Sequence, residues 1–408
     1  MSSPASDAPI IDDRLARFNV FRLAAAQALA GANSTVIMTT GAIVGSILAP
    51  RVDLATLPVS IYVVGTAAGT LPAGIIARRF GRNAAFVAGT CCGVAVGLIA
   101  AAAIYLGSFA LFCAGTFVGG FYQAVAQTFR FAATDTASPE FRPKALSWVM
   151  VGGVFSAVLG PQLVNFTMDI WPPYLFMASF LAQGVVALLC MAVLAGTRLP
   201  KPASGVVSGG RPLSEIARQP KFIAAVLSAI VSYALMNLLM TSAPLAMKMC
   251  GLSVSDATWG IQWHIVGMFL PSFWTGGLVV RFGAPVVITA GLLLISAAAG
   301  AGLAGTSAWH FWIGLVLLGV GWNLGFIGAS SLVVETHRPE ERNRVQSLND
   351  FLVFGTMAIG SFASGQILAW WGWDYVNLVA FPAVALALSV LFFSGSYRKS
   401  AVGVVSPA

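Results

Sequence analysis

Amide and aromatic side chains recur inside the long apolar segments of this chain, where polar groups are costly unless they face a cavity or a partner. Tyr122 and Gln123 are adjacent in one such segment, with Gln127 one turn further, and Trp322 and Asn323 are adjacent in another. Aromatic faces stack on flat rings, and amides both donate and accept hydrogen bonds. These residues therefore predict a site for a flat, polar, heteroaromatic solute. The alternative is that the amides bond neighbouring helices.

Other apolar segments carry further polar or aromatic residues. The remaining candidate binding residues are Asn33, Tyr62, Gln162, Asn237, Gln262 and Trp263. No Asp or Glu lies at mid-depth in any predicted helix, so we expect no site for a metal or a small cation. The five cysteines lack metal-ligand spacing and are interpreted as packing residues, and no cofactor is expected.

His264 is the histidine that lies well inside an apolar segment. Its imidazole could titrate near neutral pH, which makes it a candidate for proton coupling. A lone buried histidine can equally be a hydrogen-bonded packing residue, and the sequence leaves both interpretations open.

The composition explains where these side chains must lie. Hydrophobic residues make up 58% of the 408 residues and charged residues only 9%, against roughly 25% charged residues in a soluble domain. Only a lipid bilayer provides an apolar environment large enough for so many hydrophobic residues. The apolar runs are about 20–25 residues long, which is the length of membrane-spanning helices rather than of the strands of a β-barrel. The net charge of +8 is then interpreted as a marker of membrane topology, and no nucleic-acid partner is expected.

We predict an all-α membrane protein with two six-helix bundles, 19–196 and 222–396. The segment 197–221, rich in Pro, Gly and Ser, is predicted to be a cytoplasmic linker, with tails at 1–18 and 397–408. The twelve predicted transmembrane helices are 19–47, 57–77, 84–106, 108–130, 145–168, 173–196, 222–247, 257–279, 285–305, 308–334, 345–370 and 375–396.

Basic residues fall almost entirely on one side of this topology. The side with both termini collects 20 of the 22 Lys and Arg residues, and the other side holds only Arg51 and Lys248. Cytoplasmic loops carry the Lys/Arg excess, so both termini are predicted to be cytoplasmic.

The two halves of the chain repeat each other. A shift of 202 residues places "GIIARRFG" (74–81) on "GGLVVRFG" (276–283), and a shift of 200 places "SPEFRPKALS" (138–147) on "RPEERNRVQS" (338–347). Matches at a nearly constant offset indicate a duplication of six helices, both copies in the same orientation.

A parallel six-plus-six repeat is the plan of the major facilitator superfamily. "GIIARRFGRN" resembles that family's loop motif "G-x-L-A-D-R-x-G-R-R", and "LGPQL" at 159–163 resembles part of its antiporter motif. The resemblance implies a monomeric secondary transporter of the inner membrane that moves a small molecule, with or without protons, by alternating access. Three departures from the family pattern weaken the case for proton-driven drug efflux. Arg78 replaces the acid of the loop motif, and the Gly-Gly of the antiporter motif is missing after Pro161. The segment "GTFVGGFYQAVAQTF" (115–129) lacks the basic residue that many proton-coupled members carry in this helix.

Charged residues at the cytoplasmic helix ends form a predicted gate. Its members are Arg78, Arg79, Arg82, Asp135, Arg281, Glu335 and Asp350. Arginine in such a place favours a bidentate carboxylate partner. We expect Arg79 and Arg82 to pair with Asp135, Arg281 to pair with Glu335, and Asp350 to bind Arg78 or a neighbour across the two halves. The alternative is that these arginines only mark topology.

Three functions remain open. The first is uptake of a small neutral or weakly anionic nutrient, for which riboflavin is one candidate. The second is proton-coupled efflux of drugs or metabolites. The third is a role as a membrane assembly factor without transport, which the polar mid-depth pairs disfavour. The chain has no G-x-x-x-x-G-K-[ST] loop and no catalytic constellation, so an enzyme is not expected.

Overall fold

The computed structural model describes residues 12–51, 54–55, 57–200 and 210–397, and it is helical with no strand among those residues. The helices are, in chain order, α1 (Asp13–Leu48), α2 (Leu57–Phe80), α3 (Arg82–Leu106), α4 (Phe109–Gln127), α5 (Phe129–Ala132), α6 (Arg142–Met150), α7 (Gly152–Thr167), α8 (Met177–Ala195), α9 (Leu213–Ala217), α10 (Pro220–Met249), α11 (Val254–Phe269), α12 (Ser272–Phe282), α13 (Ala284–Ala304), α14 (Ala308–Val334), α15 (Arg342–Leu378) and α16 (Ala380–Phe393).

Ten helices of the described part are long and apolar enough to cross a membrane, or eleven if the bent pair α11–α12 is one span. The pairs α4–α5 and α6–α7 each form one such span, Phe109–Ala132 and Arg142–Thr167. The predicted helix 345–370 lies in α15 but is not among them. The structure therefore supports a polytopic all-helical protein, and the count of twelve stays a prediction.

The bend between α11 and α12 has a chemical cause. The two helices meet at 42°, and Pro271 lies in the break, where it cannot donate the hydrogen bond of a continuous helix. Asn323 of α14 stabilises the break, because its Nδ2 donates to the Met268 carbonyl and to Ser272 Oγ, both at 2.6 Å. Thr275 Oγ1 donates to Asn323 Oδ1 at 2.6 Å.

Two glycines make equivalent turns in the two halves. Gly81 joins α2 to α3 with a φ of 90°, and Gly283 joins α12 to α13 with a φ of 87°. Residues with a Cβ rarely adopt such angles, so glycine is needed at both places. The turns occupy matching positions of the predicted 202-residue repeat.

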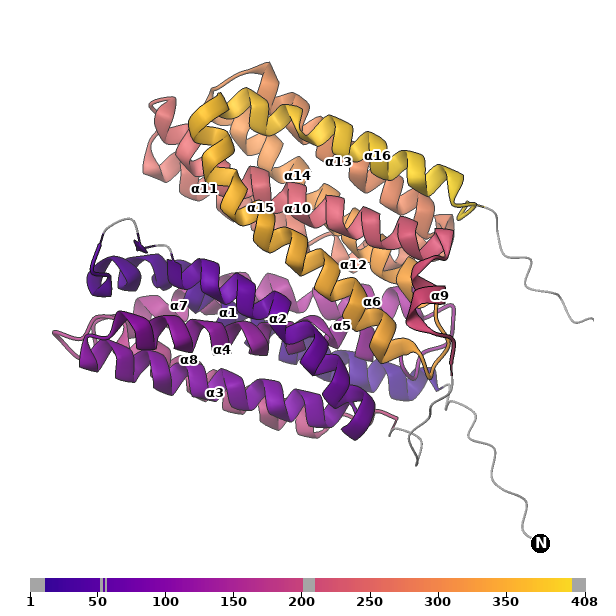
Figure 1. Ribbon diagram of the computed structural model, residues 1–408, viewed down its shortest axis with the longest axis horizontal. Coiled ribbons are helices and arrows are strands. Elements are labelled where there is room, and N and C mark those ends of the chain that lie inside the picture. Colours follow the sequence, from indigo (N-terminus) through magenta and orange to yellow (C-terminus); the bar gives the residue numbers. More distant parts are fainter. Residues whose placement is uncertain (1–11, 52–53, 56, 201–209, 398–408) are drawn as a thin grey trace, which may run out of the picture.

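The helices form two groups (Figure 1). Helices α1 to α8 pack mainly against one another, as do α10 to α16. We call these groups the first and the second bundle. The bundles are joined mainly where α2 lies against α15 and α6 lies against α12, and further where α6 meets α14 and α7 meets α11.

Both bundles share one end, which we call the basic end and define by Arg82, Asp135 and the start of α15. Helix α1 begins and α16 ends at this end (Figure 1). The start of α1 is held there because Asp12 N donates to the Thr136 carbonyl at 3.0 Å.

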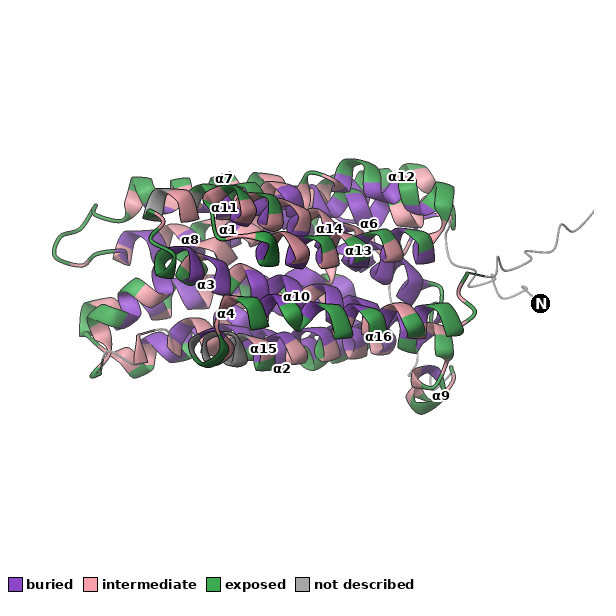
Figure 2. Ribbon diagram, turned by 90° about the horizontal axis from the view of Figure 1, so that it is seen from above, coloured by how far each residue is buried: buried purple, intermediate pink, exposed green. Residues whose placement is uncertain are grey.

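Buried residues line the inside of the bundles, and exposed residues cover their outer faces (Figure 2). Large apolar side chains are among the exposed ones, such as Phe21 at 78% and Phe166 at 75%. A water-soluble protein would bury such surface, whereas lipid tails solvate it. The burial pattern therefore agrees with the composition in placing the protein in a bilayer.

The linker residues from 210 onward are anchored to the second bundle. Arg211 N and Nε donate to Glu341 Oε1 at 2.8 and 3.0 Å, and Arg211 Nη2 donates to Oε2 at 2.7 Å. These hydrogen bonds from Arg211 hold the pKa of Glu341 at about 2. Glu341 directly precedes α15, so the linker is fixed to the start of that helix. Residues 201–209 of the predicted linker lie outside the described residues.

Candidate substrate site and gate between the bundles

Four side chains form a charge cluster at the basic end: Arg82 of α3, Asp135 of the loop after α5, and Arg342 and Gln346 of α15. Arg82 Nε and Nη2 donate to the two Asp135 carboxylate oxygens at 2.5 and 3.1 Å. Arg342 reaches the same carboxylate at 3.4 Å from the second bundle. Arg82 Nη2 also donates to Gln346 Oε1 at 2.8 Å. The charge cluster therefore ties the two bundles together.

The electrostatics of Asp135 keep this cluster charged. Burial alone would raise the pKa of the Asp135 carboxyl, but Arg342 and Arg82 outweigh burial and lower that pKa below its ordinary value. Asp135 is therefore ionised at neutral pH whenever the two arginines surround it.

The structure corrects part of the predicted ion pairing in the first bundle. Arg82 pairs with Asp135, as predicted. Arg78 and Arg79 are exposed at the end of α2 and make no ion pair with any residue that the structure describes. The carboxylate that Arg79 was expected to bind is instead occupied by Arg342 of the second bundle.

A second correction concerns Glu335. It was expected to bind Arg281, but Lys221 at the start of α10 lies closer and pairs with it, with Nζ 2.6 Å from Oε2. The Arg281 guanidinium lies 5.1 Å from the ring centre of its neighbour Phe282. Both members of the Lys221–Glu335 pair are partly exposed, so this pair contributes little stability.

Two glycine–serine contacts lock the bundles beside the charge cluster. Gly74 of α2 lies against Ser347 of α15, and Gly276 of α12 lies against Ser147 of α6. Ser147 Oγ accepts from Gly276 N at 3.0 Å and donates to the Ser272 carbonyl. These contacts occupy matching positions of the predicted repeat, so the two bundles meet by the same device used twice.

An ion pair lies deeper between the bundles. Arg130 of α5 and Asp350 of α15 are both buried, with Arg130 Nη2 2.5 Å from Asp350 Oδ1. Gln127 Oε1 accepts from Arg130 Nη1 at 3.0 Å, and Asn349 Nδ2 donates to Asp350 Oδ1 at 3.0 Å. Asp350 was expected to bind Arg78 or a neighbour across the two halves, and the structure pairs it with Arg130 instead.

Arg130 is a candidate site residue that sequence reasoning missed. It was interpreted as a topology marker at the end of a helix, and the helix was taken to lack a base. The structure buries its guanidinium inside the span Phe109–Ala132. The available signal was spacing, because Arg130 lies seven residues after Gln123 and three after Gln127, on one helix face.

Four aromatic rings of the second bundle lie next to this ion pair. The Tyr233 ring meets those of Trp322, Phe326 and Phe354 edge to face, with centroids 5.1–5.4 Å apart. Trp322 stacks on Phe326 at 5.2 Å, and the Arg130 guanidinium lies 4.7 Å from the Phe326 ring centre. We call these rings the aromatic cluster. Of its members, Trp322 was among the binding residues predicted from the sequence.

Polar atoms around the aromatic cluster lack partners. Trp322 Nε1, Arg130 Nε and Asp350 Oδ2 are buried without a hydrogen bond. Gln123 lies one turn above Gln127 on the same face as Arg130, is half-buried, and makes no side-chain hydrogen bond with a described residue. Buried donors and acceptors are normally hydrogen-bonded, so these atoms could bond water or a polar solute.

Three predicted binding residues bond or pack inside the first bundle instead. Asn33 Nδ2 donates to the Gln183 carbonyl of α8 at 2.9 Å, and Tyr62 donates to Ser34 Oγ at 2.7 Å. Tyr122 packs on α3, where a Cβ on Gly93 would lie 2.7 Å from its ring. Asn33 and Tyr122 thus hold helices of the first bundle together, whereas Tyr62 also lies within electrostatic range of Tyr233 in the aromatic cluster.

Polar residues of the second bundle behave similarly. His264 Nδ1 lies 2.8 Å from the Leu315 carbonyl of α14, and the side chain is fully buried. The Asn323 side chain makes its hydrogen bonds to Met268 and Ser272 at the α11–α12 bend. Asn237 is buried on α10, with Nδ2 unpartnered. His264 and Asn323 thus hold helices of one bundle together, which is the packing alternative considered for them.

The remaining candidates lie on outer surfaces or near the interface. Gly153 of α7 contacts Phe269 of α11. Gln162 lies nine residues further along α7, which places it on the opposite side of that helix, and it is exposed. Gln262 is exposed on the same face of α11 as Phe269, seven residues away, so it faces the first bundle. Trp263 is exposed on another face.

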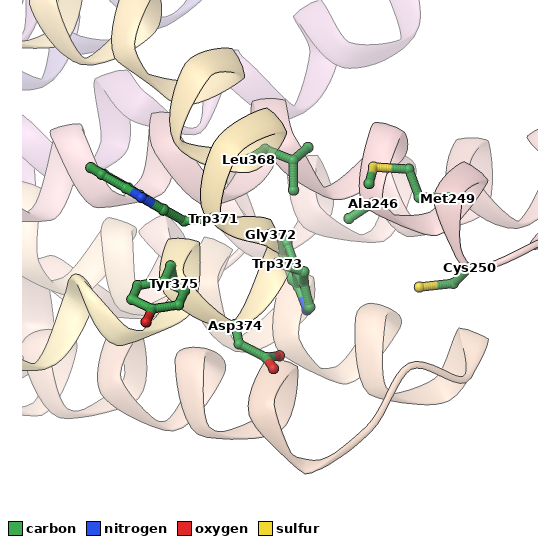
Figure 3. A pocket seen from close by; sticks show the side chains of 9 residues that line it. All are labelled: Ala246, Met249, Cys250, Leu368, Trp371, Gly372, Trp373, Asp374 and Tyr375. Carbon is green, nitrogen blue, oxygen red and sulfur yellow. The ribbon is translucent and has the colours of Figure 1, made fainter.

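A separate pocket lies away from the basic end, and Figure 3 shows its lining from close by. Its volume is about 370 Å³, and its lining comes from the end of α10 and the kink of α15: Ala246, Met249, Cys250, Leu368, Trp371, Gly372, Trp373, Asp374 and Tyr375. Gly372 makes the kink with a φ of 80°. All its lining belongs to the second bundle, and an alternating-access carrier needs its substrate between the two halves. The aromatic cluster with Arg130 draws on both halves, whereas the lining of this pocket does not.

Comparison with known proteins identifies the family. A family model described as Major Facilitator Superfamily matches residues 23–269 and 225–404. The chain is 46% identical over 380 residues to the riboflavin transporter RfnT of Brucella anthropi, covering 92% of this chain and 96% of that protein. It is 30% identical to the uncharacterized MFS-type transporter YddS of Bacillus subtilis over 89% of this chain and 87% of that one.

Solved structures agree on the fold. The proton:xylose symporter XylE superposes with a TM-score of 0.78, covering 93% of this chain and 96% of that chain. The sequence identity is 14%, so this likeness concerns the fold alone. With the family match over most of its length, the chain belongs to the Major Facilitator Superfamily and is a secondary transporter.

Proposed function

We propose that this transporter imports a riboflavin-like heteroaromatic solute across the inner membrane. The relative RfnT, at 46% identity over nearly the whole chain, carries the name of a riboflavin transporter. The basic end, with 20 of the 22 Lys and Arg residues on its side, is then cytoplasmic. The protein acts as a monomer, and no nucleic acid takes part.

One observation carries the proposal: the aromatic cluster and the Arg130–Asp350 pair meet between the bundles. Tyr233, Trp322 and Phe326 supply ring faces from the second bundle, and Arg130 supplies charge from the first. A flat heterocycle would stack on the rings. Its rim would pair with the orphaned donors Trp322 Nε1 and Arg130 Nε and with the acceptor Asp350 Oδ2.

The arrangement also suggests how transport proceeds. The charge cluster and both glycine–serine contacts close the basic end. A solute that enters from the opposite side and binds Arg130 or Asp350 competes with their ion pair. Weakening that pair releases α15 from α5, after which the bundles separate at the basic end and open the site to the cytoplasm.

Uptake into proteoliposomes tests the proposal. Purified protein is reconstituted, and accumulation of radiolabelled riboflavin is measured beside a panel of labelled vitamins and sugars. We expect riboflavin to accumulate and unlabelled flavins to compete. Accumulation of no vitamin, together with drug resistance of cells that express the protein, would contradict import.

Proton-coupled efflux is the second candidate, favoured by the buried acid–base pair Arg130–Asp350 within the spanning region. The same vesicles distinguish it by their response to a pH gradient. Drug extrusion driven by an imposed gradient, with riboflavin unaffected, would replace the import proposal.

A further inference from the structure

His337 lies beside the charge cluster, in the loop between α14 and α15. Its ring is half-buried and fully engaged. Nδ1 lies 3.1 Å from the Arg338 carbonyl, and Nε2 lies 3.1 Å from the side-chain nitrogen of Gln346. Gln346 is the same residue whose Oε1 accepts from Arg82 Nη2 at 2.8 Å. His337, Gln346 and Arg82 therefore form a chain that ends on Asp135.

The hydrogen-bond roles in this chain follow from Arg82. A guanidinium only donates, so Gln346 must present its oxygen to Arg82 and its NH₂ group to His337. His337 Nε2 must then accept, and Nδ1 must carry the proton that it donates to the Arg338 carbonyl. The closed basic end thus holds His337 as one neutral tautomer.

A second proton on His337 has no place in this arrangement. It would point Nε2–H at the NH₂ group of Gln346. Rotating the Gln346 amide would satisfy His337 but would turn NH₂ toward the donors of Arg82. No orientation of the Gln346 amide satisfies both neighbours, so protonation must break either the His337–Gln346 bond or the Arg82–Gln346 bond, and the second of these ties α3 to α15.

We propose that His337 and Gln346 form a proton-sensitive latch, in which protonation of His337 loosens the Arg82–Gln346 contact between the bundles and favours opening of the basic end. The latch acts on Arg82 through Gln346, so His337 is a positioning residue and touches no substrate. The latch does not depend on which solute is transported, so this proposal can hold or fail whatever the substrate is.

The surroundings of His337 support the direction of this effect. Burial lowers the pKa of His337 to about 4, and Arg82 and Arg342 act in the same sense, while the Arg338 carbonyl and Asp135 oppose them. An ordinary histidine has a pKa of about 6.5. The neutral latch is therefore intact above pH 6.5, and the closed state loses stability as the pH falls from 6.5 toward 4.

The distance between the bundles at the basic end tests the latch without substrate. Spin labels are attached to Glu140→Cys and Arg218→Cys in a variant whose five native cysteines are replaced. Both sites are exposed, one on the loop after α5 and one after α9. Pulsed electron–electron double resonance then gives the distribution of distances between the two labels at several pH values from 7.5 to 5.

We expect the long-distance population to grow as the pH falls, by up to tenfold per pH unit below 6.5. His337→Gln keeps an acceptor for Gln346 but cannot titrate, so it should abolish this pH response. His310→Gln, at a half-buried histidine near the start of α14, is the matched control and should leave the response unchanged.

Gln346→Glu gives an independent test with the opposite sign. A carboxylate at this position binds Arg82 and prefers protonated His337, so lowering the pH should close the basic end rather than open it. A wild-type pH response in His337→Gln, or an unaltered sign in Gln346→Glu, would overturn the proposal.

Discussion

Gly74 of α2 lies so close to Ser347 of α15 that a Cβ on the glycine would stand 2.7 Å from the serine Cβ. Rotating the serine side chain cannot relieve that overlap, so the helix backbones would have to separate. Gly276 and Ser147 repeat the relationship between α12 and α6, with 2.8 Å between the added Cβ and the Ser147 Cβ. The same close glycine–serine contact therefore joins the bundles at two matching places.

Replacing either glycine should shift the protein toward the state that is open at the basic end. Gly74→Ala and Gly276→Ala introduce overpacking of about 1–3 kcal/mol, which corresponds to about a 5- to 150-fold change in the ratio of open to closed protein. The label distances at positions 140 and 218 measure that ratio.

Gly277→Ala is the control, because a Cβ at this neighbouring residue meets nothing within 4 Å. It should leave the distance distribution unchanged. If Gly276→Ala behaves like Gly277→Ala, close contact at Gly276 is not what holds the basic end shut.

Breaking the Arg130–Asp350 pair should destabilise the protein strongly. Arg130→Leu or Asp350→Leu leaves the partner charge buried alone, at a cost of about 3–5 kcal/mol. The double variant removes both charges and should be more stable than either single variant. Thermal unfolding of the purified protein measures the difference.

The Lys221–Glu335 pair provides the contrast. Because both side chains are partly exposed, Lys221→Ala should change stability by less than about 1 kcal/mol.

The outcome that would contradict the prediction for Arg130 and Asp350 is additivity. If the effects of Arg130→Leu and Asp350→Leu simply add in the double variant, the two charges are not coupled.

Trp322 should contribute to substrate binding through both its ring and its indole N–H. Trp322→Phe keeps an aromatic ring but removes the unpaired Nε1 donor. Loss of one hydrogen bond of about 0.5–1.5 kcal/mol raises the transport KM roughly 2- to 10-fold, and Trp322→Leu should raise it further. Initial rates of riboflavin uptake measure the change.

Trp263→Phe is the matched control, since Trp263 is half exposed on the outer face of α11. It should leave KM unchanged. Equal effects of the two tryptophan substitutions would move the binding site away from the aromatic cluster.

Glu341 should make the protein acid-sensitive. Its pKa is lowered to about 2 by the hydrogen bonds of Arg211, so its contribution is present above the ordinary pKa of about 4.3 and is lost as the pH falls toward 2. We expect wild-type stability to fall by about 2–3 kcal/mol over this range.

Glu341→Gln should be less stable than the wild type at pH 6, with the difference shrinking at low pH. Thermal unfolding at several pH values follows this convergence. A constant difference between the two proteins from pH 6 to pH 3 would contradict the role assigned to the Arg211–Glu341 bonds.

Much of the fold could be predicted from the sequence, because apolar runs, repeats and turn motifs are each visible in a short stretch of residues. Apolar runs predict helices wherever they occur, and the near-constant offset between Gly74 and Gly276 reveals the duplication whatever the packing. The turn at Gly81 was similarly visible as a motif, and its φ of 90° gives the reason.

The site was less accessible, since hydropathy says how deep a residue lies but not which way it faces. Asn33, His264 and Asn323 were reasonable candidates by depth, and each instead bonds a neighbouring helix of its own bundle. Arg130 was passed over because a base at a helix end usually faces water.

Contacts between residues more than two hundred positions apart come from packing of the bundles. Arg130 meets Asp350, and Arg82 meets Gln346, because α2 crosses α15 and α6 crosses α12. Charge counting predicted that arginines and acids gather at one end. Which arginine binds which acid depends on the rotation of each helix about its axis, a property that no local stretch of residues specifies.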